Sequence, residues 1–388
     1  MSTVEGISFN RRELAGAFGD IGTDFPLLVA MVMAADLHAP SALIMFGVMQ
    51  IATGAIYKMP MPAQPLKAMA TLVIAQQLTG DLLFGAGLAI GTIMLALSLS
   101  GALDGLAKLI PKVVIRGLQL GLGITLALLA LKQYIPAEGV FGYLLAIAAF
   151  GLVIYLMGSQ KYPAAIVVIG LGVLYALFFK LSLKDWTGTI GLYIPQWHMP
   201  SQDNILKGFV LLALPQIPLS LGNSLLATRQ VAKDLFPERK PFSIKQLGIT
   251  YALMNLINPF FGGIPTCHGA GGMVGHYTFG GRTGGSAILY GTLYLVLGLF
   301  FGENFETIMQ VFPLPVLGVI LLFESVALMM LIKDVTGETK GFAITFIVGV
   351  TAAGLPYGFL IAMMLGTVLY YLPMRFDNLS KLGNNKGK

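Results

Sequence analysis

Charged residues are scarce in this 388-residue sequence, in which Asp, Glu, Lys and Arg together make up 11%. A soluble domain carries roughly 25% charged residues, because its surface faces water. A water-soluble globule is therefore excluded, and lipid must cover most of the exterior. Cysteine is nearly absent too, since Cys267 is the single one, and a disulfide within the chain is excluded. The start of the chain shows no hydrophobic run with a small-residue cleavage site, so we expect no cleavable signal peptide.

Motifs for nucleotide or metal chemistry are also missing. No Gly-x-x-x-x-Gly-Lys-[Ser/Thr] run is present, and the histidines His38, His198, His268 and His276 show no metal-ligand spacing. The net charge of +6 comes from basic residues spread over many short loops, which does not suit a nucleic-acid surface. We therefore expect no enzyme, no cofactor, no bound metal and no nucleic-acid partner. A membrane-embedded enzyme or a channel stays open as an alternative.

Apolar runs dominate instead, with 56% hydrophobic residues and a mean hydropathy of +0.80. About 20 apolar residues cross the hydrocarbon core of a bilayer. Two segments, 60–79 and 264–280, are apolar but broken by Pro or Gly near their starts, and they predict half-helices as elements 3 and 10 of fourteen. The other predicted spans are 14–36, 41–57, 82–100, 112–132, 139–157, 163–180, 205–227, 245–261, 284–302, 313–332, 338–354 and 357–374.

The basic residues give these spans an orientation. With both ends on one side, nineteen of the 24 Lys and Arg residues fall on that side, four fall on the other, and Lys67 lies within the membrane. Cytoplasmic loops carry an excess of Lys and Arg. We therefore expect a multi-pass protein of the plasma (inner) membrane with both termini in the cytoplasm.

The two halves of the chain resemble each other. Residues 110–114 (IPKVV) align with 312–316 (FPLPV) at an offset of 202, and 61–69 (MPAQPLKAM) lie against 264–272 (IPTCHGAGG) at an offset of 203. Each repeat would hold seven elements, an odd number, so the second half must be inverted relative to the first. Coincidence between proline-containing apolar segments is the alternative.

The two interrupted segments predict an anion site. Closely spaced prolines in 60–65 remove backbone donors, so a helix can start only near Leu66, and 264–272 similarly reads as extended chain before a helix. Inverted symmetry would point these helix starts at each other in mid-membrane. Each start offers unpaired N–H groups and about half a positive charge, which together bind anions. Without such a site, a dianion in hydrocarbon faces a desolvation cost on the order of tens of kcal/mol.

Polar residues surround these predicted helix starts. Lys67 falls in the first turn, where a cation is disfavoured, so it indicates an anionic partner, either the substrate or a carboxylate of Asp20 or Asp24. His268 is expected either to donate to an oxyanion or relay a proton, or to be a packing residue. Cys267 is expected to be small filler rather than a ligand. The candidates from these segments are Gln64, Lys67, Thr266, Cys267, His268 and Gly269.

Two further spans contribute polar groups. Asp20 and Asp24 lie within the first span, where carboxylates are costly and usually functional, and both are ion-coupling candidates. Glu324 is a third coupling candidate or a buried structural acid. In the eighth span, polar side chains at helical spacing offer donors to an oxyanion, although interhelical hydrogen bonds would also explain them. The substrate-binding candidates here are Asp20, Thr23, Gln216, Ser220, Asn223 and Ser224.

Four motifs in this order resemble the molybdate transporter family, which is related to the sulfate permeases: 18–23 (FGDIGT), 62–67 (PAQPLK), 215–224 (PQIPLSLGNS) and 267–272 (CHGAGG). The resemblance spans nearly the whole chain. It implies the all-α polytopic fold shared with uracil permeases, with seven plus seven inverted elements in a core and a gate domain. The implied parts are core 14–100 and 205–302, gate 101–180 and 303–374, and a tail at 375–388 with no soluble regulatory domain.

The same resemblance implies a secondary active transporter that moves molybdate by elevator-type alternating access. The anion would bind between core and gate at the two facing helix starts. Asn223 and His268 fall near positions where uracil permeases carry base-reading acids, which disfavours a nucleobase. The expected partners are the oxyanion and membrane lipid, and a homodimer is also considered. Alternatives are transport of sulfate or another oxyanion, or an anion channel of the same fold.

Overall fold

The computed structural model describes residues 6–156, 164–180, 191–240 and 242–373. Apart from two three-residue strands, the regular structure in these ranges is helical. Five helices are long and apolar enough to cross a membrane, and a bent pair at the N-terminus makes up to six. The connection between the predicted spans 139–157 and 163–180 and the predicted tail at 375–388 lie outside the described residues.

The first half of the chain supplies nine helices in the described ranges and the strand β1 (Ala63–Pro65). These helices are α1 (Arg11–Ala17), α2 (Ile21–Ala34), α3 (Ala39–Tyr57), α4 (Lys67–Gln76), α5 (Gly80–Ser100), α6 (Ala102–Leu109), α7 (Lys112–Leu129), α8 (Gly139–Leu156) and α9 (Ala164–Phe179).

The second half supplies another nine described helices and the strand β2 (Thr266–His268). These helices are α10 (Gln202–Gly208), α11 (Leu214–Leu219), α12 (Thr228–Leu235), α13 (Ile244–Ile257), α14 (Ala270–Thr278), α15 (Gly285–Val311), α16 (Leu314–Met330), α17 (Thr339–Gly354) and α18 (Gly358–Tyr371). Two π-helical stretches, Phe209–Ala213 (η4) and Ser220–Ala227 (η5), join α10, α11 and α12 into one long span.

The helix boundaries have local causes. His38 caps α3 by accepting from the Ser41 N–H, and Pro40 fits the first turn because its missing N–H would have no partner there. Lys58 ends α3 in the left-handed region at φ 53°, and Gly101 ends α5 at φ 77°, where a glycine meets no steric cost. The predicted first span is broken rather than continuous: a 3-10 turn separates α1 from α2 with a bend of 46°.

The repeats are inverted copies, as the sequence predicts. The half-helices α4 and α14 begin at Lys67 and Ala270, an offset of 203 (270 − 67), and α7 and α16 begin 202 residues apart (314 − 112). Helix α3 packs along α15, and their repeat counterparts α13 and α5 pack along each other. At the first of these contacts a Cβ on Gly47 would lie 2.6 Å from the Gly291 carbonyl oxygen, so only glycine allows this backbone approach.

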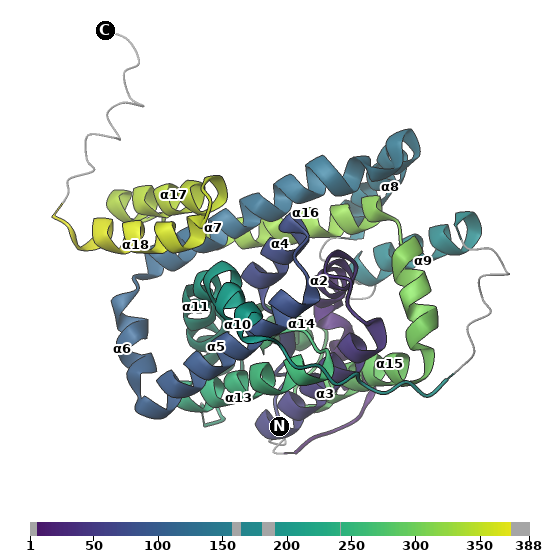
Figure 1. The fold of residues 1–388 in the computed structure, drawn as a ribbon, viewed down its shortest axis with the longest axis horizontal. Coiled ribbons are helices and arrows are strands. Elements are labelled where there is room, and N and C mark those ends of the chain that lie inside the picture. The colour runs from purple at the N-terminus through teal and green to yellow at the C-terminus, as the bar shows by residue number, and fades with distance from the viewer. Residues whose placement is uncertain (1–5, 157–163, 181–190, 241, 374–388) are drawn as a thin grey trace, which may run out of the picture.

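Two layers are visible in the fold. In Figure 1, helices α7, α8, α16, α17 and α18 form a layer along the top of the view, and α3, α5, α10, α11, α13 and α14 group below it. These groups are the gate and the core of the seven-plus-seven fold. The residue boundaries between the two domains stay a prediction.

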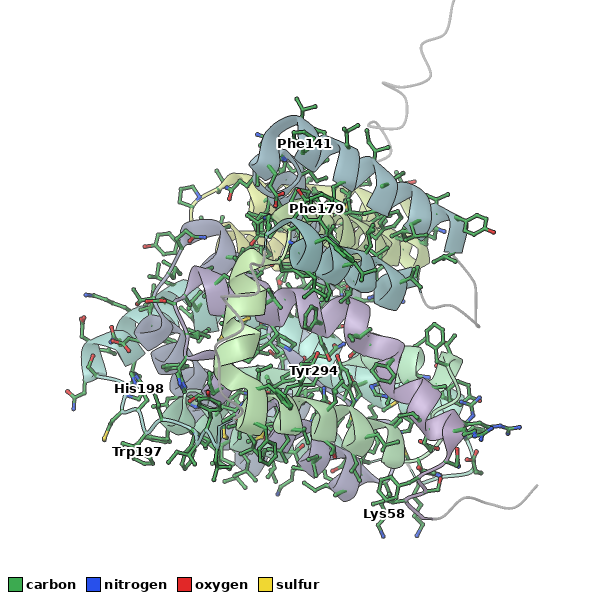
Figure 2. The ribbon with its side chains drawn as sticks, turned by 90° about the vertical axis from the view of Figure 1, so that its right-hand side faces the viewer. Lys58, Phe141, Phe179, Trp197, His198 and Tyr294 are labelled. Carbon is green, nitrogen blue, oxygen red and sulfur yellow. The ribbon has the colours of Figure 1, made fainter. Side chains whose placement is uncertain are left out.

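The surface matches a protein surrounded by lipid. Phe141 on α8 and Phe179 on α9 are 74% and 77% exposed, and Figure 2 shows them on the gate side of the molecule. Lys58 and the pair Trp197 and His198 lie on opposite sides of the same view. An exterior of exposed apolar side chains between two polar ends is what a bilayer requires.

Candidate functional site

The centre of the molecule is a short antiparallel pairing of β1 with β2. Gln64 lies opposite Cys267, with Ala63 opposite His268 and Pro65 opposite Thr266. At the repeat offset of 203, Gln64 and Cys267 are equivalent residues (267 − 64). Because they pair with each other at the middle of the two strands, the two-fold axis that relates the repeats passes through the centre of the strand pair. Each strand leads directly into its half-helix, and the N-termini of α4 and α14 therefore flank the strand pair from opposite sides.

The N-terminus of α4 is capped by a side chain from the long eighth span. The Gln216 Oε1 accepts from the backbone N–H groups of Ala68 (2.9 Å) and Met69 (3.3 Å). Its amide nitrogen donates to the Ser220 hydroxyl at 3.1 Å, and that hydroxyl contacts the Tyr251 hydroxyl at 2.8 Å. Two donors of the first turn are thus already satisfied by a neutral group.

The N-terminus of α14 is approached by a carboxylate. A Cβ on Gly272 would clash with the Asp20 carboxylate, which therefore lies against the first turn of α14. Asp20 also accepts a hydrogen bond of 2.6 Å from the Gln64 amide. Gly269 is similarly close to Gln64, whose amide oxygen would overlap a Cβ there. A negative charge at this position is stabilised by the helix dipole, and glycine is needed to make room for it.

A small cavity of about 10 Å³ lies beside the strand pair, between core and gate. This volume suffices for about one water molecule, so a bound oxyanion would require the surrounding side chains to separate. Leu122 on α7 and Leu328 on α16 form the gate wall of the cavity together with Gln119. The core side brings together Lys67, Gln216, Leu219, Asn223, Ser224 and Cys267.

Five of the predicted substrate-binding residues therefore meet in one place: Lys67, Gln216, Asn223, Ser224 and Cys267. Cys267 was expected to be filler, but it lines the cavity with 4% of its surface exposed. The burial of Lys67 is only partial. It lies close enough to Asp24 and Cys267 to act on both electrostatically.

Other predicted residues point elsewhere. The His268 Nε2 is 2.7 Å from the Thr250 hydroxyl, and its ring packs edge-on against Tyr57 at 5.3 Å, so it faces α3 and α13. The backbone of Thr266 is bound on both sides by Asn255, with hydrogen bonds of 3.0 and 2.6 Å. Because neighbouring residues of a strand face opposite ways, Cys267 meets the cavity and these two residues do not. The expectation that His268 donates to the ligand does not fit this placement.

Of the three acidic coupling candidates, Asp20 and Asp24 are both buried side chains. Asp24 is fully buried, and its Oδ1 has no hydrogen-bond partner in the described part of the chain. Its other oxygen accepts a long hydrogen bond of 3.5 Å from Gln50. The side chains of Thr23 and Glu324 lie outside the described residues, although their backbones belong to α2 and α16.

Gln119 is a lining residue that the sequence analysis missed. Its Oε1 accepts from Arg116 at 2.9 Å, which leaves the NH₂ end of this nearly buried amide to donate to a ligand. A polar side chain among the apolar residues that follow Arg116 in α7 could have identified Gln119 from the sequence. Leu122 and Leu328 could not have been identified in this way, because apolar residues are common throughout the spans.

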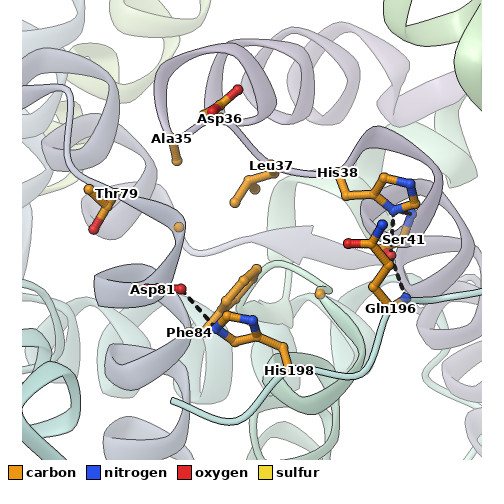
Figure 3. Close-up of a pocket in the computed structure, with 12 residues that line it drawn as sticks. Ala35, Asp36, Leu37, His38, Ser41, Thr79, Asp81, Phe84, Gln196 and His198 are labelled. Carbon is orange, nitrogen blue, oxygen red and sulfur yellow. Dashed lines mark hydrogen bonds and ion pairs between the residues drawn. The ribbon is translucent and has the colours of Figure 1, made fainter. Parts of the chain in front are cut away.

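A separate cavity of about 350 Å³ opens near the starts of α3 and α5 (Figure 3). The His198 Nε2 lies 2.8 Å from an Asp81 carboxylate oxygen there, and the Ser41 hydroxyl accepts from the Gln196 N–H at 2.9 Å. None of the predicted site residues lines it. Among the described residues, no group of three or more His, Cys, Asp or Glu side chains could hold a metal ion.

Two inverted repeats, whose interrupted helices meet between a core and a gate, define a class of polytopic membrane transport proteins. Solved members with the same fold include the transmembrane domain of a cyanobacterium bicarbonate transporter, BicA (TM-score 0.65, 20% identity, 95% of this chain and 99% of that one). Another is murine Slc26a9, an anion transporter in the inward-facing state (TM-score 0.69, 12% identity, 100% and 70%).

Within this class, the chain belongs to the molybdate transporter family. Residues 12–126 and 208–328 match the family described as "Molybdate transporter of MFS superfamily". The chain is 34% identical to Molybdate transporter 1 of Arabidopsis thaliana, over 92% of this chain and 87% of that protein. It is 25% identical to Molybdate transporter 1 of Chlamydomonas reinhardtii, over 91% and 90%. The family expected from the four sequence motifs is thereby confirmed.

Proposed function

We propose that this protein is a secondary active transporter of molybdate that works by elevator-type alternating access. The observation that carries the proposal is the central cavity, where a cation and several polar side chains gather beside the N-terminus of α4. The family relationship supports molybdate as the substrate, because relatives that align over most of this chain are named molybdate transporters.

The donors at the cavity suit an oxyanion. Molybdate accepts hydrogen bonds and donates none, and Asn223, Ser224 and the NH₂ end of Gln119 can all donate. Lys67 supplies the positive charge that a dianion needs away from water. The three leucine side chains that line the cavity would exclude water and so strengthen these interactions.

The position of the cavity between core and gate suggests how access alternates. A larger cavity of about 610 Å³ lies on the α12 side of the central one, and another of about 340 Å³ lies on the side of the α17–α18 turn. A shift of the core (14–100 and 205–302) against the gate (101–180 and 303–374) would connect the substrate to each in turn. We further propose a plasma-membrane location with both termini in the cytoplasm, which puts the larger cavity on the cytoplasmic side.

We assign energy coupling to protons carried by Asp20 and Asp24. Both carboxyl groups are buried, and the Asp24 Oδ1 has no hydrogen-bond partner in the described part of the chain, so a proton on Asp24 would remove an uncompensated buried charge. A charged pair beside a dianion would repel it. A proton that enters with the substrate removes part of this repulsion, which supports symport.

Uptake of radioactive molybdate into proteoliposomes, with and without an inward proton gradient, tests the proposal. We expect accumulation above the external concentration that is abolished by a protonophore. No uptake at any substrate concentration would refute transport, and uptake that ignores the gradient would refute proton coupling. Competition by sulfate, tungstate and selenate would tell a molybdate transporter from a general oxyanion transporter, and single-channel currents would identify a channel.

A further inference from the structure

The cavity of about 610 Å³ is lined by charged residues that the proposed transport site does not use. Its gate side comes from the start of α7 and the short helix after α16, and its core side comes from η5 and α12. It shares no lining residue with the central cavity. The charged residues in its lining are Lys112, Arg116, Arg229, Lys233 and Asp334, which sum to +3 (four positive, one negative).

The gate side of this cavity is partly neutralised. Asp334 accepts from Arg116 with both oxygens, at 2.9 and 2.6 Å, and lies 2.7 Å from the Lys112 ammonium. One carboxylate therefore serves two cations and holds them in place. Arg116 also donates to Gln119, so it stands between this cavity and the central one.

The core side carries two cations without a carboxylate. Arg229 and Lys233 are four residues apart on α12, a spacing that puts them on the same helix face. Neither forms an ion pair with any residue in the described ranges. The Arg229 Nε–H is buried there without a hydrogen-bond acceptor, although a buried donor is normally satisfied. An acceptor supplied by a ligand would remove this deficit.

We propose that this cavity is a second oxyanion-binding site, in which the anion is held by Arg229 and Lys233 of the core and by Arg116 and Lys112 of the gate. Arginine presents several donors in a rigid fork that matches tetrahedral oxyanions. Because the cations come from both domains, an anion between them stabilises the arrangement in which the domains approach each other here. If the proposed transport cycle holds, anion binding at this site slows the return of the emptied core.

Two sources could supply the oxyanion. It could be molybdate or a similar ion in solution, or the phosphate of an acidic lipid, because basic pockets between membrane helices also bind lipid headgroups. The shared chemistry is a tetrahedral oxyanion with at least one negative charge. Binding measurements in lipid discs with and without an acidic lipid separate the two sources.

Equilibrium binding of radioactive molybdate to the purified full-length protein tests the site. We expect two sites in the unmodified protein and one in the double variant Arg229→Gln, Lys233→Gln, with the affinity of the remaining site changed less than about twofold. The matched control Lys245→Gln, which removes an exposed cation from the start of α13, should retain both sites. The same number of sites in the double variant as in the unmodified protein would overturn the proposal.

A second variant predicts the opposite effect and does not depend on the first. Asp334→Asn frees Lys112 and Arg116 and should tighten binding about tenfold at the site that the double variant removes. Unchanged or weaker binding there would contradict the proposal. The same measurements in discs of phosphatidylcholine, with or without phosphatidylglycerol, identify the source: suppression by phosphatidylglycerol assigns a lipid phosphate, and two sites in both discs assign the dissolved anion. Failure of the transport proposal would appear as absent uptake and would leave this binding comparison readable.

Discussion

The variant Gln216→Glu should leave the fold of the transport site intact and remove most of its affinity for anions. The Gln216 oxygen accepts from the first turn of α4 at 2.9 and 3.3 Å, and a glutamate oxygen can accept the same two bonds. Its nitrogen donates to Ser220 at 3.1 Å, and the serine hydroxyl can rotate to donate instead. A carboxylate is also favoured at a helix N-terminus. The variant should therefore fold and be at least as stable as the unmodified protein.

Its affinity for molybdate should nevertheless collapse. Gln216 lines the central cavity, so the new charge would lie next to the bound anion. Two like charges about 4 Å apart at an effective dielectric constant of about 20 repel by about 4 kcal/mol. Since about 1.4 kcal/mol corresponds to a tenfold change, affinity should fall by about a thousandfold. The second charge of molybdate increases this loss, and acidic pH, which protonates the glutamate, should reverse part of it.

Isothermal titration calorimetry on the detergent-purified variant gives the affinity, and thermal unfolding gives the stability. The control is Gln202→Glu, the same chemical change at an exposed first-turn position of α10, remote from the cavity lining. It should bind molybdate like the unmodified protein. Equal affinity in Gln216→Glu and Gln202→Glu would refute an anion site at the start of α4.

Four further changes test individual residues. Lys67→Ala should weaken molybdate binding roughly tenfold to a hundredfold while the protein stays folded, as expected for a charged hydrogen bond, and unchanged binding would leave Lys67 a structural role. Molybdate should slow the reaction of Cys267, the single cysteine, with a maleimide. If molybdate gives no protection, Cys267 only fills space beside the cavity and does not contact the anion. His268→Phe should lower the unfolding temperature, because the hydrogen bond between the buried His268 and Thr250 is lost, but should leave binding within about threefold. Asp24→Asn should retain binding yet lose the stimulation of uptake by a proton gradient.

Much of the architecture could be predicted, because apolar runs and prolines act locally. The proline run before Leu66 removes backbone donors, and α4 begins at the next residue, Lys67. The shared offset identified the repeats, and the same offset relates the starts of α4 and α14. The pieces of the fold that depend on neighbouring residues were therefore visible in the sequence.

The direction of the site side chains could not be predicted, because it depends on pairing between distant segments. Cys267 and His268 are adjacent, and only the register of β2 against β1 decides which of them faces the cavity. Gln119 comes from the gate, and its contribution depends on how α7 lies against the core. The break between α1 and α2 also lies at a contact between distant segments, where a Cβ on Gly19 would clash with the backbone of Gly275.

The backbones of the two half-helix starts are related by symmetry, but the side chains around them are not. This difference explains how binding of the substrate can be coupled to binding of a proton. Both half-helix starts attract negative charge, but Gln216 caps α4 with a neutral oxygen, whereas the Asp20 carboxylate already lies against α14. A substrate dianion is therefore drawn towards α4 and Lys67, and it meets Asp20 across the strand pair as a like charge. Protonation of Asp20 or its neighbour Asp24 would lower that repulsion, and a bound dianion would in turn favour the proton. By this reciprocity, substrate and proton help each other to bind, as a symporter requires.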